Sequence, residues 1–162
     1  MNLREDKHWA YGAYSFTSDA VGQRPWMAFA PVQIDKTVPA LQEMVREIGD
    51  YATGAKPATQ AEVDKARADE INGLPGSFET AGAVMNAIGD IVRYDRPDDY
   101  VVRHAAQIES LTTDQVNAAA KTIAPKALTW VVVGDLSKIE QPIRDLKLGT
   151  VTVIDADGNP KK

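Results

Sequence analysis

Strand-like and helix-like segments occupy separate stretches of this sequence, and that separation constrains the fold most. Strand-sized apolar runs lie near both ends, whereas apolar residues recur at helical spacing between them. The expected strands are 11–17, 26–33, 128–133 and 150–154, and the expected helices are 38–53, 60–72, 78–92, 98–111, 113–124 and 137–146. Segregated elements of this kind pack as layers, so we expect an α+β fold, with an antiparallel sheet and helices packed on one of its faces.

Two of the expected helices begin at a capping-box pattern. Thr59-Gln-Ala-Glu62 and Thr112-Thr-Asp-Gln115 each place a threonine three residues before an acid or amide. In such a box the threonine hydroxyl accepts from a backbone N–H of the first turn, and the acid or amide accepts from the threonine N–H. Both helix starts are therefore predicted from local sequence alone.

The bulk composition is that of an ordinary globular chain with room for one core. The 162 residues are 44% hydrophobic and 25% charged, with a net charge of -5 and no cysteine. The acidic balance disfavours nucleic acid or an anionic membrane as the main partner. The missing cysteines exclude disulfides and thiolate metal sites. We expect one domain over residues 1–154, a polar tail over 155–162 and no membrane span.

The first residues suggest that the domain is incomplete at its start. Residues 1–8 lack the apolar core and cleavage site of a signal peptide. Residues 2–7 form a charged, helix-like run with no cap before it. We therefore expect the chain to open inside a helix, in its last turn.

A search for catalytic patterns finds no complete set in this chain. A zinc hydrolase needs about three protein ligands, and the only histidines are His8 and His104, neither with a second histidine in helical reach. No Gly-x-Ser-x-Gly, dinucleotide or phosphate loop occurs. Asp155-Ala-Asp-Gly-Asn resembles the start of a calcium loop but lacks the closing glutamate, so we interpret it as a turn. No metal site is expected in this chain.

One pair of residues combines useful chemistry with a defined position. Arg4 lies at the end of the first helical turn, and Tyr11 at the start of the following strand. A guanidinium can hold peptide carbonyl groups, and a tyrosine hydroxyl can donate to a developing oxyanion. The simpler interpretation is a surface ion pair of Arg4 with Glu5 or Asp6, beside a packed aromatic ring.

The chain resembles the C-terminal, non-zinc part of the insulinase/pitrilysin family of zinc metallopeptidases. The resemblance rests on Leu3-Arg4-Glu5 with Ala10-Tyr11, on the helix that begins Thr59-Gln-Ala-Glu62, and on Leu111-Thr-Thr-Asp-Gln-Val followed by Leu128-Thr-Trp-Val-Val-Val-Gly-Asp. It implies that Arg4 and Tyr11 bind the substrate backbone and that Tyr11 helps to stabilise the tetrahedral intermediate. It also implies a zinc-bearing partner half, in the same full-length chain or as a separate subunit.

Three departures from the family qualify this resemblance. His8-Trp9 stands where the family commonly has Gly-Leu, which would alter the approach to Tyr11. The first strand and helix of the family domain are missing, which would leave an open sheet edge and expose Tyr14 and Phe16. The zinc motif His-x-x-Glu-His is absent.

The function expected from the resemblance is that of a substrate-binding, non-catalytic half of a zinc-dependent endopeptidase acting on unfolded peptides. Zinc would be the cofactor of the partner half, and this chain alone would be inactive. Two alternatives stay open: an inactive, peptidase-like scaffold that binds a partner without turnover, and a stand-alone peptide-binding module. The resemblance also suggests the periplasm, with the cytoplasm as the alternative, and self-association is a further expectation.

Overall fold

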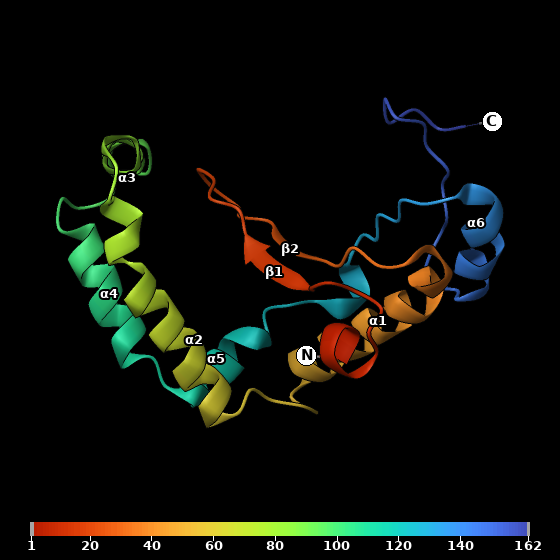
Figure 1. Ribbon diagram of the computed structural model, residues 1–162, viewed down its shortest axis with the longest axis horizontal. Helices are drawn as coiled ribbons and strands as arrows, with labels where there is room; N and C mark the ends of the chain where they lie inside the picture. Colours follow the sequence, from red (N-terminus) through yellow and green to blue (C-terminus); the bar gives the residue numbers. More distant parts are fainter. Residues whose placement is uncertain (1, 162) are drawn as a thin grey trace. The chain divides into compact units, whose positions relative to one another are not determined.

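The computed structural model describes residues 2–161, and the expected α+β class is confirmed. The helices and a two-stranded antiparallel hairpin occupy separate segments (Figure 1). Met1 is the predicted start of the domain and Lys162 the predicted end of the tail, and both lie outside the described residues. The elements are β1 (Tyr14–Thr17), β2 (Trp26–Phe29), α1 (Thr37–Thr53), α2 (Gln60–Gly73), α3 (Ala81–Arg93), α4 (Tyr100–Ser110), α5 (Thr113–Ala120) and α6 (Leu136–Asp145), with a π-helical turn at Asn2–Asp6 and 3-10 turns at Ile34–Lys36, Pro75–Phe78 and Pro125–Ala127.

The chain divides into two compact units. The first comprises Met1–Ser15, Ala28–Arg46 and Leu128–Lys162, and the second comprises Phe16–Met27 and Glu47–Ala127. Compact units of one chain need not unfold separately, so the expectation of a single domain over 1–154 stays a prediction. Within residues 2–161, every helix is too short or too polar to traverse a lipid bilayer.

The second unit is held together by contacts between helices and by helix side chains that bond the backbone beside another helix. Helix α2 packs against α4 and α5. The Asn117 side chain on α5 clamps the backbone before α2, because it accepts from the Ala58 N–H at 2.8 Å and donates to the Ala58 carbonyl at 3.1 Å. Arg67 on α2 donates to the Leu111 carbonyl at 2.8 Å. These bonds satisfy the backbone groups of Ala58, just before α2, and the carbonyl of Leu111 at the end of α4.

Both predicted capping boxes are present. The Thr59 hydroxyl accepts from the Glu62 N–H, and the Glu62 carboxylate accepts from the Thr59 N–H at 2.8 Å. Thr112 and Gln115 make the same reciprocal pair at the start of α5. The Thr59 N–H and then its hydroxyl, which also donates to the carboxylate, lower the pKa of Glu62.

The expected sheet is smaller than the sequence indicated. Residues 128–133 and 150–154 were predicted as strands, but apart from an isolated bridge at Ile154 they form no ladder. Residues 128–133 still alternate between partly covered and exposed, as a strand would, and Val133 is 91% exposed. The local pattern thus favours a strand, whereas no neighbouring strand supplies hydrogen-bond partners. Packing of helices against one face of a wide sheet therefore stays a prediction.

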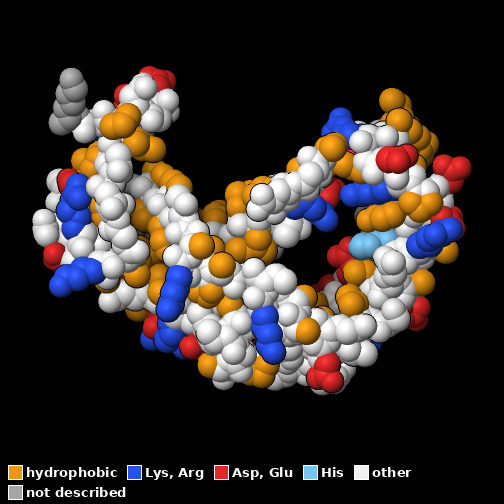
Figure 2. Space-filling model, turned by 180° about the vertical axis from the view of Figure 1, so that it is seen from behind, with side chains coloured by type: hydrophobic (Ala, Val, Ile, Leu, Met, Phe, Trp, Pro, Cys, Tyr) orange, Lys and Arg blue, Asp and Glu red, His pale blue; other side chains and the backbone are white. Residues whose placement is uncertain are grey.

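The apolar side chains expected at an open sheet are exposed. Tyr14 stacks on Phe29 with ring centroids 5.4 Å apart, and about half of each side chain is accessible. Phe16 is exposed as well, as expected. Figure 2 shows hydrophobic side chains over much of the face in view.

The total accessible surface is larger than the sizes of the two units require. It is 11869 Å². Two separate compact bodies of these sizes would together expose roughly 9,500 Å² by the usual scaling of surface with mass. The excess, roughly 2,300 Å², is comparable to the area that one subunit loses in a large obligate interface.

Self-association should follow from this exposed surface. We expect multi-angle light scattering to detect dimers or larger species at micromolar concentration, because exposed apolar patches and unpaired strands favour association. Val133→Lys should shift the population towards monomer, whereas the same change at the exposed Val102 on α4 should not. A stable monomer with a single sharp thermal transition would contradict this prediction.

Removing one capping box should weaken the second unit by a predictable amount. Thr59→Ala should lower the free energy of unfolding by about 1 kcal/mol in urea titrations at neutral pH. Because the pKa of Glu62 is lowered in the folded chain, the ionised carboxylate adds stability that is complete above its ordinary pKa of 4.5. This stability is lost as the pH falls through the lowered pKa. The loss of stability caused by Thr59→Ala should therefore be smaller in acid. Thr152→Ala, an exposed position outside the helices, is the control.

Candidate functional site

Arg4 is carried by the π-helical turn Asn2–Asp6, which is anchored at its beginning. The Lys7 N–H donates to the Asn2 carbonyl at 2.9 Å, and the Asn2 side-chain amide donates to the carboxylate of Glu43 on α1. Leu3 is buried, so the opposite side of the turn faces solvent. The Arg4 side chain is 48% exposed, and its Nε lies 3.2 Å from the Glu5 carboxylate. The expected helical turn is present, and so is the ion pair with Glu5 that belongs to the simpler, surface interpretation of Arg4.

Tyr11 lies in a bend before β1 rather than at the start of the strand. The strand begins at Tyr14, so the prediction of a strand from residue 11 is wrong. The bend is compatible with glycine at position 12, because Gly12 is buried beneath the Tyr14 side chain and a Cβ at this position would overlap the Tyr14 hydroxyl. The bend leaves Tyr11 82% exposed instead of packed.

The structure brings the two predicted residues together. The Arg4 guanidinium carbon lies 5.4 Å from the centre of the Tyr11 ring, within the usual range of a cation–π contact. The guanidinium and the phenol therefore share one solvent-facing site within the first unit. In chemical terms the site offers a charged fork for carbonyl oxygens and a hydroxyl donor, next to each other and open to a ligand.

The two residues that depart from the family pattern lie between Arg4 and Tyr11. His8 adopts a left-handed backbone conformation with φ 56° and is exposed. The ammonium group of Lys7 lies over the ring of the neighbouring Trp9, 5.3 Å from the ring centroid. Two residues with bulky rings therefore stand between Arg4 and Tyr11 in the sequence, where the family pattern has glycine and leucine.

The histidines and acids show no arrangement that would hold a metal ion. Among residues 2–161, no three His, Asp or Glu side chains gather in one place. His104 lies on α4 and stacks on Tyr100, with ring centroids 5.4 Å apart and planes 11° apart.

The calcium-like segment at residues 155–159 is a turn, as predicted. Oδ1 of Asp155 accepts from the N–H groups of Asp157 at 3.0 Å and Asn159 at 2.8 Å, so the carboxylate serves to hold the turn. The same backbone donors, Asn159 first, lower the pKa of Asp155. Gly158, with φ 84°, closes the turn.

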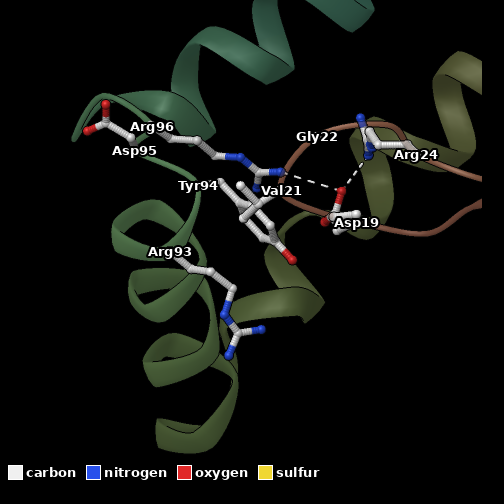
Figure 3. A pocket seen from close by; sticks show the side chains of 9 residues that line it. Asp19, Val21, Gly22, Arg24, Arg93, Tyr94, Asp95 and Arg96 are labelled. Atoms are coloured by element: carbon white, nitrogen blue, oxygen red, sulfur yellow. Dashed lines mark hydrogen bonds and ion pairs between the residues drawn. The ribbon is translucent and has the colours of Figure 1, made fainter.

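A pocket that the sequence analysis did not anticipate lies in the second unit. It has a volume of about 290 Å³ and is bordered by the connection between β1 and β2 and by the end of α3 (Figure 3). It is lined by Asp19, Ala20, Val21, Gly22, Arg24, Arg93, Tyr94, Asp95 and Arg96. The close spacing of Arg93 and Arg96 is only a weak signal for this pocket in the sequence, because Arg24 and Asp19 come from a distant segment.

No protein-family model matches this chain, and a search of curated proteins gives no match either. The function therefore has to be argued from the geometry of the residues themselves.

The metal content of the isolated chain is directly testable. We expect no stoichiometric zinc after dialysis and no hydrolysis of a quenched fluorescent peptide, because the chain has two histidines, no cysteine and no zinc motif. The measurement is elemental analysis together with a fluorescence assay with and without chelator. One bound zinc per chain with chelator-sensitive cleavage would contradict this expectation.

Proposed function

We propose that this chain is the substrate-binding, non-catalytic half of a zinc-dependent endopeptidase of the insulinase/pitrilysin type, acting on unfolded peptides. The observation that carries the proposal is the Arg4–Tyr11 pair, in which the guanidinium lies over the ring and the ring is 82% exposed. An aromatic side chain held this far into solvent contributes little to a core. A ligand-binding role explains its position better than packing does.

The two side chains would divide the work between binding and chemistry. Arg4 would hold a carbonyl oxygen of an extended peptide through N–H groups of its charged fork. Tyr11 would donate its hydroxyl proton to the oxygen of the carbonyl under attack, where negative charge develops. Contact with the Tyr11 ring would keep the guanidinium beside the phenol, so that both groups face the same stretch of substrate.

The attacking water belongs to the other half in this proposal. A zinc ion there would lower the pKa of its bound water and polarise the carbonyl group. The residues of this chain would assist only when the two halves close around the peptide, which would exclude water from the pair and strengthen both contacts. The chain by itself would then bind peptides without cleaving them.

Substitutions at the pair separate this proposal from a plain surface ion pair. In the complete enzyme, Tyr11→Phe should lower kcat by about 10- to 1000-fold, as loss of one oxyanion donor does. The variant keeps the aromatic ring beneath Arg4, so the loss reports the hydroxyl alone. Arg4→Ala should raise KM more than it lowers kcat. Steady-state kinetics on a peptide substrate give both values.

Tyr14→Phe is the matched control, because Tyr14 is a nearby, partly exposed tyrosine outside the pair. It should leave both constants unchanged. If the Arg4 and Tyr11 variants keep wild-type kinetics, the two residues have no role in binding or chemistry, and the proposal is wrong. Peptide binding in the absence of any zinc half or turnover would instead indicate the stand-alone peptide-binding module, and partner binding without peptide binding would indicate the scaffold.

A further inference from the structure

Three arginines from two distant segments line the pocket of the second unit. Arg24 comes from the connection between β1 and β2, whereas Arg93 and Arg96 come from the end of α3 and the residues that follow it (Figure 3). Its volume, about 290 Å³, lies at the small end of the range for ligand pockets and suits a small molecule or a single side chain.

The backbone at Arg96 is fixed by the way in which α3 ends. The Arg96 N–H donates to the Ile91 carbonyl at 2.9 Å, and the Asp95 N–H donates to the Val92 carbonyl at 3.4 Å. With Asp95 at φ 49°, these two bonds form a Schellman motif, which usually has glycine at the left-handed position. Asp95 is one of the few residue types that tolerate this conformation. Pro97 then stops further helix.

The Arg96 side chain is held between two aromatic rings. Its guanidinium carbon lies 4.7 Å from the centre of the Tyr94 ring and 4.4 Å from that of Tyr100. The Arg96 side chain is 21% exposed, less than half the value for Arg24, which is 50%. A guanidinium fixed in this way loses little further entropy when it binds a ligand.

One carboxylate already shows what these guanidiniums bind. Oδ1 of Asp19 accepts from Nη2 of Arg24 and lies 3.5 Å from Nη2 of Arg96 (Figure 3). Asp19 thus acts as an internal oxyanion shared by two cations. Arg24 lies in the same loop as Asp19, and its Nε also donates to the Ser18 carbonyl at 3.5 Å.

The charges around the pocket do not cancel. The Asp95 carboxylate points away from Asp19 and Arg24 (Figure 3). Among residues 2–161, Arg93 has no ion-pair or hydrogen-bond partner for its side chain. Three guanidiniums line the pocket together with two carboxylates, Asp19 and Asp95, so the lining carries an excess of one positive charge, whereas the chain as a whole carries a net charge of -5.

The C-terminus of α3 works against an anion here, but only weakly. A helix C-terminus is equivalent to about half a negative charge, and it is partly offset where its carbonyls are hydrogen bonded. The Ile91 and Val92 carbonyls are bonded in the Schellman motif. The excess of one guanidinium charge in the lining is larger than the half charge of the helix end.

We propose that this pocket binds a small oxyanion, the carboxylate or phosphate group of a ligand, through Arg24, Arg93 and Arg96. Arg96 provides the fixed donor, and the exposed Arg24 and Arg93 close on the ligand from two sides. Asp19 competes with the ligand for Arg24 and Arg96. This proposal does not depend on the peptidase assignment, since all the residues involved belong to the second unit.

Titration calorimetry with inorganic phosphate and with succinate, at low salt, tests the proposal and distinguishes the two ligand chemistries. We expect saturable binding of one or both anions, at one site per chain. Saturation by phosphate alone would identify a phosphate ligand, and saturation by succinate alone a carboxylate ligand. Failure of both anions to saturate would overturn the proposal.

Variants of the pocket locate the site. Arg24→Gln and Arg93→Gln should each weaken anion binding by about tenfold or more, as loss of a charge-assisted contact does. Arg103→Gln is the matched control with the same change in charge, because Arg103 lies on α4 and pairs with Asp99 at 2.7 Å. Equal losses in all three variants would mean that anions respond only to overall charge and would overturn the proposal.

A fourth variant tests the same idea in the opposite direction. Asp19→Asn removes the internal competitor while keeping its size, so anion binding should become several-fold tighter. If Asp19 were needed only to hold the loop in place, the same variant would bind less tightly. Weaker binding with an unchanged thermal transition would therefore overturn the role given to Asp19.

Discussion

The scarcity of buried apolar surface constrains every other feature of this chain. Among residues 2–161, the buried apolar side chains are Leu3, Ala40, Leu41, Ala52, Val63, Ala120 and Ile139, and three of these are alanines. A methyl side chain contributes little to the hydrophobic driving force, because that force scales with the apolar area removed from water. Hydrogen bonds from a helix side chain to the backbone beside another helix, such as the Asn117 clamp on Ala58, therefore carry a larger share of the specificity.

The same shortage explains why the sheet stops at two strands. A two-stranded hairpin is marginal by itself and needs further strands or a helix on its face. The Tyr14–Phe29 stack supplies part of that stabilisation within the hairpin. The alternating burial of residues 128–133 shows a segment that already has the side-chain pattern of a strand without a partner for its backbone.

The sequence predicted best what depends on neighbours in the chain. Both capping boxes could be read directly, since Thr59 and Glu62 are three residues apart and need no tertiary contact. The absence of a ladder at 128–133 could not be predicted in this way, because ladder formation depends on a partner strand elsewhere in space. The bend at Tyr11 was not predicted for a related reason: the close approach of Tyr14 to Gly12 depends on the path of the folded backbone. The arginine pocket depends on a loop and a helix end that are far apart in the sequence.

Both candidate sites use an arginine beside an aromatic ring, but they differ in how firmly that arginine is held. Arg4 contacts one ring and is 48% exposed, whereas Arg96 contacts two rings and is 21% exposed. A loosely held guanidinium pays more entropy when it binds, so it binds weakly until a second surface restricts it. This is the behaviour required of a half-site that works only after closure on a partner. The pocket around Arg96, with its donor already fixed, needs no such closure and is suited to binding a ligand within a single unit.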